Sequence, residues 1–512
     1  MQPDETECDV LVIGGGINGA GVARDAAGRG LRVVLVERDD LAGHTSSAST
    51  KLIHGGLRYL EYYEFRLVRE ALQERERLLA IAPHISRPLR FVVPRPQGGR
   101  PAWLIRLGLL LYDRLGGRQS LPRSQAVDLA DPVWGEGLRP DLIQHFAKGF
   151  AYSDAWVDDA RLVVLNALDA AERGARVLTG TAFVGARIAG DRWAVDLAPN
   201  PAAARSPLAG PVTLRARVIV NAAGPWADDV IAAPPPGRRQ GRLALAKGSH
   251  LIVPRLYPGD HAFLLQQADG RIVFTIPYQG RFTLIGTTDV VVGGEERQHP
   301  QISPAEIDYL CAAVQPFFAR AVSAADIVST YSGIRPLYDD GSADAKAITR
   351  DYVLQLGRGE GPQVLSVLGG KLTTYRRLAE HALARLAPWL PTAGPAWTDA
   401  VPLPGGDLPV GGITAFLAEV RARWPFLPGD VAERMGRAYG TRLAAVLGPA
   451  TGWADLGEDF GQGLTEAELR YLARHEWAAS AGDVLGRRTK LGLTAPPDFA
   501  GRIDRWFAAQ AG

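Results

Sequence analysis

DVLVIGGGINGAGVARDAAGRGLRVVLVER, residues 9–38, decides the fold because it combines a strand, a glycine-rich turn, a helix and a second strand. Residues 10–13 form a short apolar run rich in branched side chains, which is typical of a strand buried on both faces of a parallel sheet. Residues 33–36 repeat this pattern and end at Glu37, an acid at the distance needed to bind a ribose hydroxyl. Together these features predict a dinucleotide-binding α/β unit.

Three glycines in this stretch, Gly14, Gly16 and Gly19, have the G-x-G-x-x-G spacing. The first permits a sharp turn, the second leaves room for a pyrophosphate, and the third allows the helix to pack closely on the strand. A helix that begins there directs its free N–H groups and the positive end of its dipole toward the phosphates. The stretch alone does not choose between flavin and nicotinamide.

The composition excludes several classes of protein. A chain of 512 residues predicts two or three domains, and its formal net charge of +2 argues against a nucleic-acid partner. Cys8 and Cys311 make neither a disulfide framework nor a metal-binding set. The N-terminus is acidic and polar, unlike a secretory signal. No apolar run reaches the ~18 residues of a spanning helix, so any membrane contact is expected to be peripheral.

A loop rich in hydroxyl groups follows the second strand, with Thr45, Ser46 and Ser47 among its members. Such a loop can simply be solvated and cap a helix. We favour a loop that lies along the bound cofactor, because it leads into the segment HGGLRYL, residues 54–60. A strand end at Ala223 and Gly224 points toward the same crevice, where open α/β sheets place their ligands.

Residues 101–117, PAWLIRLGLLLYDRLGG, form the most apolar helical stretch in the chain. Two interpretations stay open. The helix can belong to the core, or it can lie in a membrane interface with Trp103, Tyr112 and its arginines at the edge.

Lysine is rare in this chain, since arginine supplies nearly all the positive charge and only six lysines occur. Lys51, Lys247 and Lys371 each lie in a glycine-flanked or strand-end motif, namely STKLIHGG, AKGSH and LGGKLTTY. A compact ammonium suits a tight anion site where arginine cannot replace it. Chance placement is the alternative with so few lysines.

Two histidines and two arginines occur in similar motifs. His54 and His250 lie in KLIHGG and KGSHL, and imidazole is a suitable general base near neutral pH. Arg58 and Arg335 lie in GGLRYL and YSGIRPL, where paired guanidinium groups would bind a phosphate or carboxylate bidentately. Surface salt bridges are the alternative for the arginines, and a structural role is the alternative for each histidine.

At these motifs the sequence resembles the FAD-dependent aerobic glycerol-3-phosphate dehydrogenases, in order and over nearly the whole chain. The blocks that carry the resemblance are SSASTKLIHGGLRYLEYYEFRLVREAL, KGSHLIVPR, IGTTDV, YSGIRPL, AITRDY, GGKLTTYRRLAEHAL, PAWTDAVPLPGG, LGEDFG and AELRYLARHEW. They are long and specific, unlike the glycine fingerprint, which many families share. The Pro-rich loops near residues 200 and 235 do not match and indicate tolerated surface variation.

The resemblance implies oxidation of sn-glycerol 3-phosphate to dihydroxyacetone phosphate, with hydride passing from C2 to flavin N5 and electrons then passing to membrane quinone. It also implies a peripheral location on the cytoplasmic face of the membrane; a homodimer stays open. The predicted fold class is α/β, with a Rossmann-type FAD-binding domain, an antiparallel-sheet substrate domain and a helical C-terminal domain. The expected boundaries are 1–85, 150–232 and 340–392 for FAD binding, 86–149 and 233–339 for substrate, 393–409 for a linker, and 410–512 for the C-terminal domain.

The chemistry assigns roles to the candidate residues. We expect His250 to be the base that takes the C2 hydroxyl proton, with His54 as the second candidate near the flavin. Arg58, Arg335 and Lys371 are expected to bind the substrate phosphate, with Tyr59 as a hydrogen-bond partner, and Arg335 and Lys371 also count as catalytic. No metal is expected. The predicted FAD contacts are Gly14, Gly15, Gly16, Asn18, Gly19, Glu37, Arg38, Thr45, Ser46, Ser47, Lys51, Leu52, Ala223, Gly224, Gly370, Lys371, Leu372 and Thr373.

Three other functions stay open from the sequence. A flavin oxidase of the same fold would pass its electrons to oxygen, and its FAD and substrate motifs would look alike. An amine or amino-acid oxidase would need a carboxylate clamp and an apolar slot, which the hydroxyl- and lysine-rich motifs disfavour. A nucleotide-binding sensor without turnover is the alternative from a different class.

Overall fold

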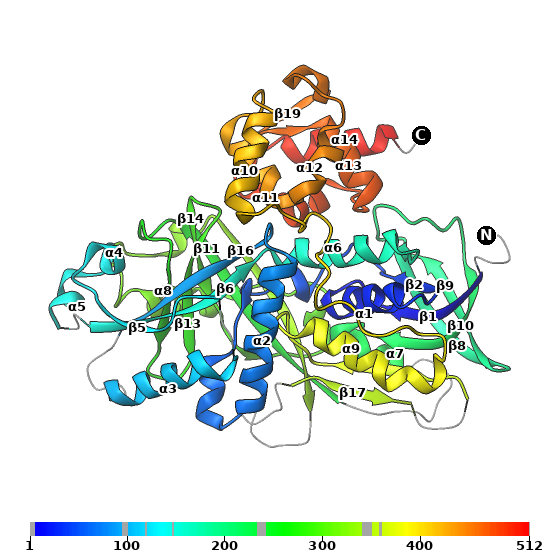
Figure 1. The fold of residues 1–512 in the computed structure, drawn as a ribbon, viewed down its shortest axis with the longest axis horizontal. Coiled ribbons are helices and arrows are strands. Elements are labelled where there is room, and N and C mark those ends of the chain that lie inside the picture. Colours follow the sequence, from blue (N-terminus) through cyan, green and yellow to red (C-terminus); the bar gives the residue numbers. More distant parts are fainter. Residues whose placement is uncertain are drawn as a thin grey trace.

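The structure is a computed structural model that describes residues 6–94, 101–117, 120–145, 148–232, 242–339, 351–357 and 361–510. Within these residues the chain forms two large sheets side by side and a helical C-terminal unit above them (Figure 1). The part of the motif AITRDY before Asp351 lies outside the described residues.

The first sheet contains the dinucleotide fingerprint. Its described strands follow the order β17-β18-β10-β1-β2-β7, and β1 runs parallel to both β2 and β10. Ile13 at the end of β1 pairs with Val36 and with Asn221, so the carboxyl ends of the three strands meet at one edge. Its strands are β1 (Glu7–Ile13), β2 (Val33–Val36), β7 (Arg176–Leu178), β8 (Thr181–Ala189), β9 (Arg192–Pro199), β10 (Val212–Asn221), β17 (Val353–Leu356) and β18 (Val364–Leu368).

Three helices cover one face of this sheet, namely α1 (Ile17–Gly28), α6 (Asp159–Glu172) and α9 (Tyr375–Leu386). The strand β1 is buried on both faces, as a continuous run of branched residues predicts. The antiparallel strands β8 and β9 continue the sheet beyond β10. This arrangement confirms the predicted Rossmann-type unit.

The second sheet is antiparallel except where β12 runs parallel to β4. The dipeptides Asp269-Gly270 and Gln279-Gly280 predict hairpin turns, and the turns on either side of β13 contain them, with positive φ at Gly270 and Gly280. The strands are β3 (Leu52–Ile53), β4 (Ser86–Pro94), β5 (Gln125–Asp128), β6 (Lys148–Val157), β11 (Arg242–Pro254), β12 (Ala262–Gln266), β13 (Ile272–Tyr278), β14 (Phe282–Gly286), β15 (Val290–Val291) and β16 (Ser329–Asp339). An antiparallel platform is therefore confirmed.

Helices enclose two apolar cores around this second sheet. The first core includes residues of α8, and the second includes residues of α2 and α3. The helices that accompany the two sheets are α2 (Phe65–Ile81), α3 (Ala102–Leu115), α4 (Pro132–Gly135), α5 (Pro140–His145), α7 (Ala227–Ala232) and α8 (Pro304–Val314). The helix α3 is not fully buried, because Leu109 and Tyr112 are buried whereas Trp103 and Leu107 are exposed.

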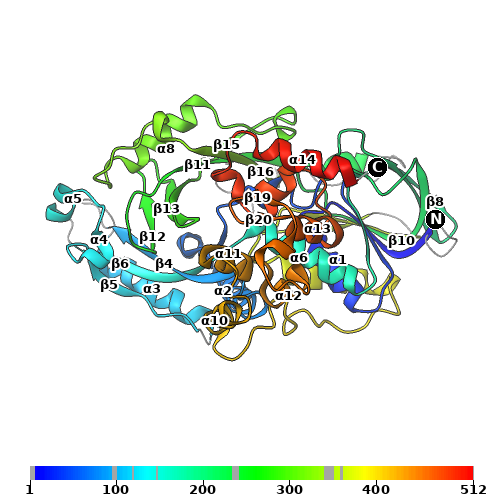
Figure 2. The same cartoon turned by 90° about the horizontal axis from the view of Figure 1, so that it is seen from above.

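The C-terminal unit is helical, as predicted, and has its own core. It lies above α6 in Figure 1 and over the middle of the molecule in Figure 2. Its elements are α10 (Gly412–Arg423), α11 (Gly429–Tyr439), α12 (Leu443–Leu447), α13 (Glu466–His475), α14 (Phe499–Gln510) and a short hairpin of β19 (Asp459–Gly461) and β20 (Leu464–Thr465). The exact domain boundaries stay predictions.

Candidate active site

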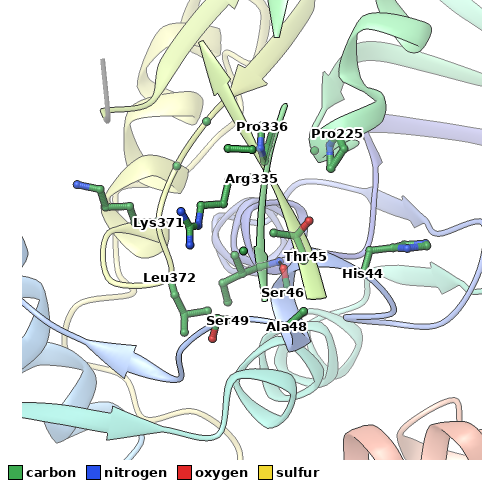
Figure 3. A pocket seen from close by; sticks show the side chains of 18 of the residues that line it. His44, Thr45, Ser46, Ala48, Ser49, Pro225, Arg335, Pro336, Lys371 and Leu372 are labelled. Atoms are coloured by element: carbon green, nitrogen blue, oxygen red, sulfur yellow. Dashed lines mark hydrogen bonds between the residues drawn. The ribbon is translucent and has the colours of Figure 1, made fainter. Parts of the chain in front are cut away.

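A cavity of about 860 Å³ lies between the carboxyl edge of the first sheet and the strands β11 and β16 of the second. Figure 3 shows Arg335 and Lys371 on one side of it and His44 on the opposite side, with Thr45 and Ser46 between them. We call the side with His44 the cofactor end and the side with Arg335 the substrate end.

The glycine turn at the cofactor end requires its glycines. Gly14 has φ +107°, and a Cβ there would lie 2.5 Å from the carbonyl oxygen of Ala222. A Cβ on Gly19 would lie 1.9 Å from the carbonyl oxygen of Gly14, so helix and turn can pack only without a side chain. The backbone N–H of Ile17 donates to Ser46 Oγ at 3.0 Å, which ties the hydroxyl loop to the start of α1.

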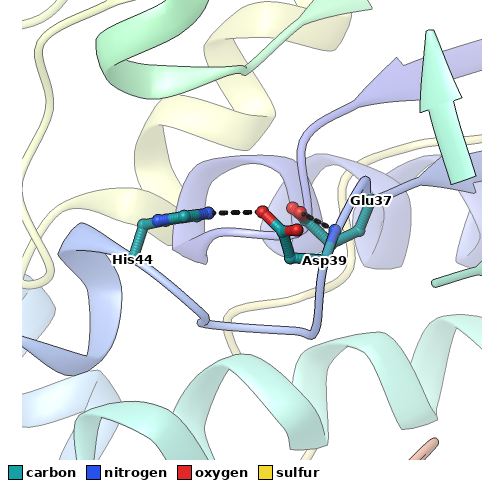
Figure 4. A group of neighbouring side chains, drawn as sticks. All are labelled: Glu37, Asp39 and His44. Atoms are coloured by element: carbon teal, nitrogen blue, oxygen red, sulfur yellow. Dashed lines mark hydrogen bonds and ion pairs between the residues drawn. The ribbon is translucent and has the colours of Figure 1, made fainter. Parts of the chain in front are cut away.

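Glu37 is held in one orientation by two backbone donors. Its carboxylate accepts from the N–H of Gly15 at 2.6 Å and from the N–H of Asp39 at 2.9 Å. Burial raises the pKa of Glu37, while these two hydrogen bonds oppose that rise. His44 Nε2 lies 2.8 Å from Asp39 Oδ2, which orients the imidazole at the cavity wall. A dashed line marks this contact in Figure 4.

Trp226 supplies an aromatic face at the same end. Arg38 stacks over its ring at 4.1 Å, and the His44 ring lies 4.6 Å from it. Trp226 and His44 were not among the predicted contacts. The motif AAGPW, residues 222–226, signalled the position of Trp226, whereas nothing in the sequence pointed to His44.

The cofactor end fits a dinucleotide. The glycine turn leaves backbone exposed to the cavity, Glu37 stands at the end of β2, and α1 begins at the turn. Asn18 Oδ1 is buried without a hydrogen-bond partner among the described residues, so an acceptor is available to a hydroxyl group of the ligand. These are the groups that a pyrophosphate and a ribose require.

The predicted cofactor residues mostly line the cavity, but four do not. Those that line it are Gly14, Gly16, Asn18, Glu37, Arg38, Thr45, Ser46, Leu52, Ala223, Gly224, Gly370, Lys371, Leu372 and Thr373. Gly15, Gly19, Ser47 and Lys51 are outside its lining. Lys51 is buried, and its Nζ lies 2.8 Å from Asp159 Oδ1 at the start of α6.

His250 lies on β11 at the substrate end. Its Nε2 is 3.0 Å from Thr50 Oγ1, and its ring stacks on Tyr331 with 4.7 Å between centroids. Burial lowers the pKa of His250 well below its usual range, and the positive charges of Arg335 and Lys51 push it in the same direction. The imidazole is therefore neutral at neutral pH and can accept a proton.

Arg335 lies on the neighbouring strand β16. It donates to Asp289 Oδ1 at 3.1 Å and to Thr287 Oγ1 at 3.2 Å. A Cβ on Gly248 would lie 2.5 Å from Nη2 of Arg335, so glycine at that position leaves room for the guanidinium. The motif IGTTDV contains both partners, but the sequence did not indicate that they contact Arg335.

Lys371 follows β18 on a turn in which Gly369 and Gly370 both have positive φ. Its Nζ lies over the ring of Tyr59 at 4.1 Å. Within the described ranges neither Lys371 nor Arg58 forms an ion pair with a carboxylate. Both line the cavity and remain available to an anion.

His54 also lines the cavity, in the loop that leads to Tyr59. Its backbone N–H donates to Thr373 Oγ1 at 3.2 Å, which joins this loop to the Lys371 turn. Burial lowers the pKa of His54, the charge of Asp154 raises it, and the charge of Lys371 lowers it. The structure thus brings His54, His250, Arg335, Lys371 and Tyr59 to one cavity.

Lys247, the third of the lysines noted in the sequence, is outside the lining of this cavity. Its Nζ lies 3.1 Å from Glu306 Oε2 and donates to the carbonyl oxygen of Gln301 at 2.9 Å. Glu306 also accepts from Ser249, the neighbour of His250. Lys247 therefore has a supporting position behind β11.

Comparison with known proteins agrees with this geometry. Residues 9–376 match the family model of the FAD dependent oxidoreductases, and residues 396–502 match that of the C-terminal domain of alpha-glycerophosphate oxidase. A glycerol-3-phosphate dehydrogenase of Pseudomonas aeruginosa is 51% identical over 98% of this chain and 95% of its own length. The chain belongs to the FAD-dependent glycerol-3-phosphate dehydrogenase family.

Two further relatives bear on this family assignment. A D-erythritol 1-phosphate dehydrogenase of Brucella abortus is 50% identical, with 99% of each chain covered. The glycerol-3-phosphate dehydrogenase of Bacillus halodurans, solved in complex with FAD, has a TM-score of 0.77 and 27% identity, and covers 99% of this chain and 91% of that one. FAD is thus the cofactor, and the glycine fingerprint belongs to a flavoprotein of this family.

Proposed function

We propose that this flavoprotein oxidises sn-glycerol 3-phosphate to dihydroxyacetone phosphate. The observation that carries the proposal is the substrate end of the cavity, where a neutral imidazole lies near two cationic side chains, Arg335 and Lys371. An alcohol that carries a phosphate needs both kinds of group. The name of the Pseudomonas aeruginosa relative, with about half of its residues identical, supports the same substrate.

The proton of the C2 hydroxyl would be accepted by His250. Either ring nitrogen could accept it: Nε2 contacts Thr50 Oγ1, and Nδ1 is buried without a hydrogen-bond partner among the described residues. The stacked ring of Tyr331 fixes the plane of the imidazole. FAD, when bound, accepts the hydride that leaves C2. His54 remains the second candidate for the base.

The phosphate would be bound by Arg335, Lys371 and Arg58, with Tyr59 beside them. Arg335 is paired with Asp289 through an exposed contact, so an incoming phosphate can replace a carboxylate that is already half solvated. Two oxygens of a phosphate suit the fork of a guanidinium, and the single charge of Lys371 complements it.

We also propose that FAD is held by the predicted residues that line the cofactor end. Glu37 would bind the ribose, and the turn at Gly14 and Gly16 would carry the pyrophosphate at the start of α1. Ser46 and Thr45 would face the same groove.

Anaerobic flavin reduction tests the substrate. The purified yellow protein should bleach when sn-glycerol 3-phosphate is added without oxygen, and dihydroxyacetone phosphate should appear in equal amount. Glycerol serves as the control for the phosphate, and sn-glycerol 1-phosphate, the enantiomer of the substrate, serves as the control for the configuration at C2. Unchanged flavin absorbance with sn-glycerol 3-phosphate would contradict the proposal.

A four-carbon polyol phosphate is a second candidate substrate, because the relative from Brucella abortus is named for D-erythritol 1-phosphate. Both compounds offer a phosphate and a secondary alcohol to the same groups. Measured kcat/KM for the two compounds decides between them, and we expect the three-carbon substrate to have the higher value.

We propose membrane quinone as the electron acceptor and α3 as the surface that meets the membrane. The outer face of α3 exposes Trp103, Leu104, Leu107, Leu110 and Leu111, with Arg106 and Arg114 also exposed on the helix. The inner face of α3 packs in the same apolar core as Leu57 and Phe274, which line the cavity. Among the described residues no helix is long and apolar enough to cross a bilayer.

Two measurements test the acceptor and the surface. The reduced protein should be reoxidised faster by a short-chain ubiquinone than by oxygen; rapid peroxide formation in air would identify an oxidase instead. Replacement of Leu107, Leu110 and Leu111 by serine should abolish sedimentation with liposomes while leaving anaerobic flavin reduction intact. The exposed residues Val133 on α4 and Ile188 on β8, which are outside the lining of the cavity, provide a control pair for the same substitution.

A further inference from the structure

Asp40 lies in the loop between Glu37 and the hydroxyl residues Thr45, Ser46 and Ser47, at the cofactor end of the cavity. Its carboxylate is bound by two arginines of the C-terminal unit. Arg488 donates to both oxygens, at 2.6 and 2.8 Å, and Arg487 Nε donates at 2.6 Å. Arg488 is buried and Arg487 is 21% exposed in its side chain. The C-terminal unit thus contacts the cofactor loop through a buried charge.

A second contact lies at the other end of the same loop. Lys490 of the C-terminal unit is 3.5 Å from Asp158, and the adjacent Asp159 binds Lys51 and Ser49. Both carboxylates stand at the start of α6. The C-terminal unit therefore contacts Asp40 directly. Its contact with Lys51 is indirect, through the first turn of α6.

The segment that supplies these groups has an unusual backbone. Residues Asp483–Arg488 form a π-helix, η10, and Lys490 has a positive φ of 62°. Such π-turns are rare and occur frequently at functional sites. Arg488 also donates to the carbonyl oxygen of Glu476, whose side chain pairs with Arg161 of α6. Arg488 therefore joins the π-helix η10 both to Asp40 and to Glu476.

We propose that the C-terminal domain retains FAD by bracing residues 40–51, with Asp40, Arg487 and Arg488 as positioning residues. Residues 44–46 and 48–50 line the cavity, and Ser46 is bonded to the start of α1. A loop of this kind loses conformational freedom when it binds a ligand, and a loop that is already held loses less. The proposal depends on FAD as cofactor and is independent of which polyol phosphate is oxidised.

The physical reason is the burial of the pair. Removing Arg488 leaves the largely buried carboxylate of Asp40 with Arg487 as its remaining charged partner, and removing Arg487 takes away one of its three charged hydrogen bonds, so either change weakens the arrangement that contains it. Here that arrangement is the loop beside the cofactor. Coupling of about 10- to 100-fold between two such regions is typical.

The test measures FAD affinity in Arg487→Met, whose partial exposure favours a folded variant, and in Arg488→Met. Apoprotein is titrated with FAD, and the quenching of flavin fluorescence gives Kd. We expect Kd to rise about tenfold for Arg487→Met and further for Arg488→Met. Arg487→Lys keeps the charge and should recover part of the loss.

The matched control is Arg442→Met. Arg442 also joins the C-terminal unit to α6, through Glu172 at 2.5 Å, but it does so at the opposite end of that helix, roughly 20 Å away. Its FAD affinity should equal that of the unmodified protein. An equal rise in Kd for Arg442→Met would overturn the proposal.

Thermal unfolding of apoprotein and FAD-saturated protein separates bracing from general stability. Bracing predicts that Arg487→Met reduces the gap between the two Tm values, because FAD then stabilises the fold less. Equal lowering of both Tm values with an unchanged Kd would mean that the arginine only stabilises the fold, and would overturn the proposal.

Discussion

The two ends of the cavity are built in different ways. At the cofactor end the carboxylate of Glu37 is held by backbone groups of the same strand-turn-helix-strand unit, Gly15 and Asp39. At the substrate end Lys371, Tyr59, His250 and Arg335 arrive from four separate segments of the chain. Within the part of the chain that the structure describes, the positive charges there either form no ion pair with a carboxylate or are paired through a solvated contact.

This difference follows from what each end has to do. The cofactor is retained through many turnovers, so backbone donors and buried pairs that hold one geometry are favoured. A substrate must enter and leave. The cationic side chains that bind it should therefore be only weakly paired beforehand, with water or with an exposed carboxylate that the substrate can replace. Variants at the two ends should therefore separate catalysis from FAD retention.

The largest expected effect is at His250. His250→Asn removes the base, so the rate of anaerobic flavin reduction should fall by about 10²- to 10⁴-fold. FAD affinity should stay unchanged, because the cofactor end is intact. Stopped-flow absorbance measures the rate, and His299→Asn, an exposed histidine outside the cavity lining, is the control. An unslowed reduction would transfer the role of base to His54.

Arg335→Ala should have the next largest effect. Loss of a charged donor to phosphate is worth about 1.5–3 kcal/mol, which corresponds to a rise in KM of about 10- to 100-fold. Steady-state kinetics with sn-glycerol 3-phosphate measures it, and the exposed Arg281→Ala of the same sheet is the control. If KM is unchanged while Kd for FAD rises, Arg335 belongs to the cofactor end and the comparison fails.

Glu37→Gln should give the opposite pattern. An amide offers a single acceptor oxygen to the two backbone donors that now bind the carboxylate, so one donor loses its partner. FAD affinity should fall about tenfold, while kcat at saturating FAD stays the same. Fluorescence titration measures Kd, with the exposed Glu419→Gln as control. A large loss of kcat with normal affinity would contradict the assignment.

The smallest effect concerns pH. The pKa of His250 lies below its usual range through burial and the charges of Arg335 and Lys51, so the active neutral form should persist to mildly acid pH. Activity should fall only as pH drops through that lowered pKa and the imidazole gains a proton. Arg335→Gln removes one positive charge, which raises the pKa and should move this acid limb to higher pH. An acid limb that moves to lower pH would mean that the charge of Arg335 does not lower the pKa of His250.

Much of the fold was predictable because short stretches of the sequence specify it. The alternation of buried strand, glycine turn and helix in residues 9–38 specifies a parallel α/β unit, and the turn residues at Gly270 and Gly280 specify hairpins. The residues of the candidate site were recognisable by type and motif. Their pairings were not, since a lysine in a glycine-rich motif has the same local signature whether it faces a cavity or a carboxylate.

The three lysines illustrate the limit of the sequence. Their motifs looked alike, yet the tertiary structure buries Lys51 against Asp159, places Lys247 on Glu306, and leaves Lys371 over Tyr59 at the cavity. The sequence by itself determined the dinucleotide turn, the antiparallel platform and the helical C-terminal unit, because short-range geometry and periodicity dictate them. Only the tertiary structure decided which charges are neutralised and which face the cavity, and it alone joined Asp40 to Arg488, because such contacts depend on segments that meet only after the chain has folded.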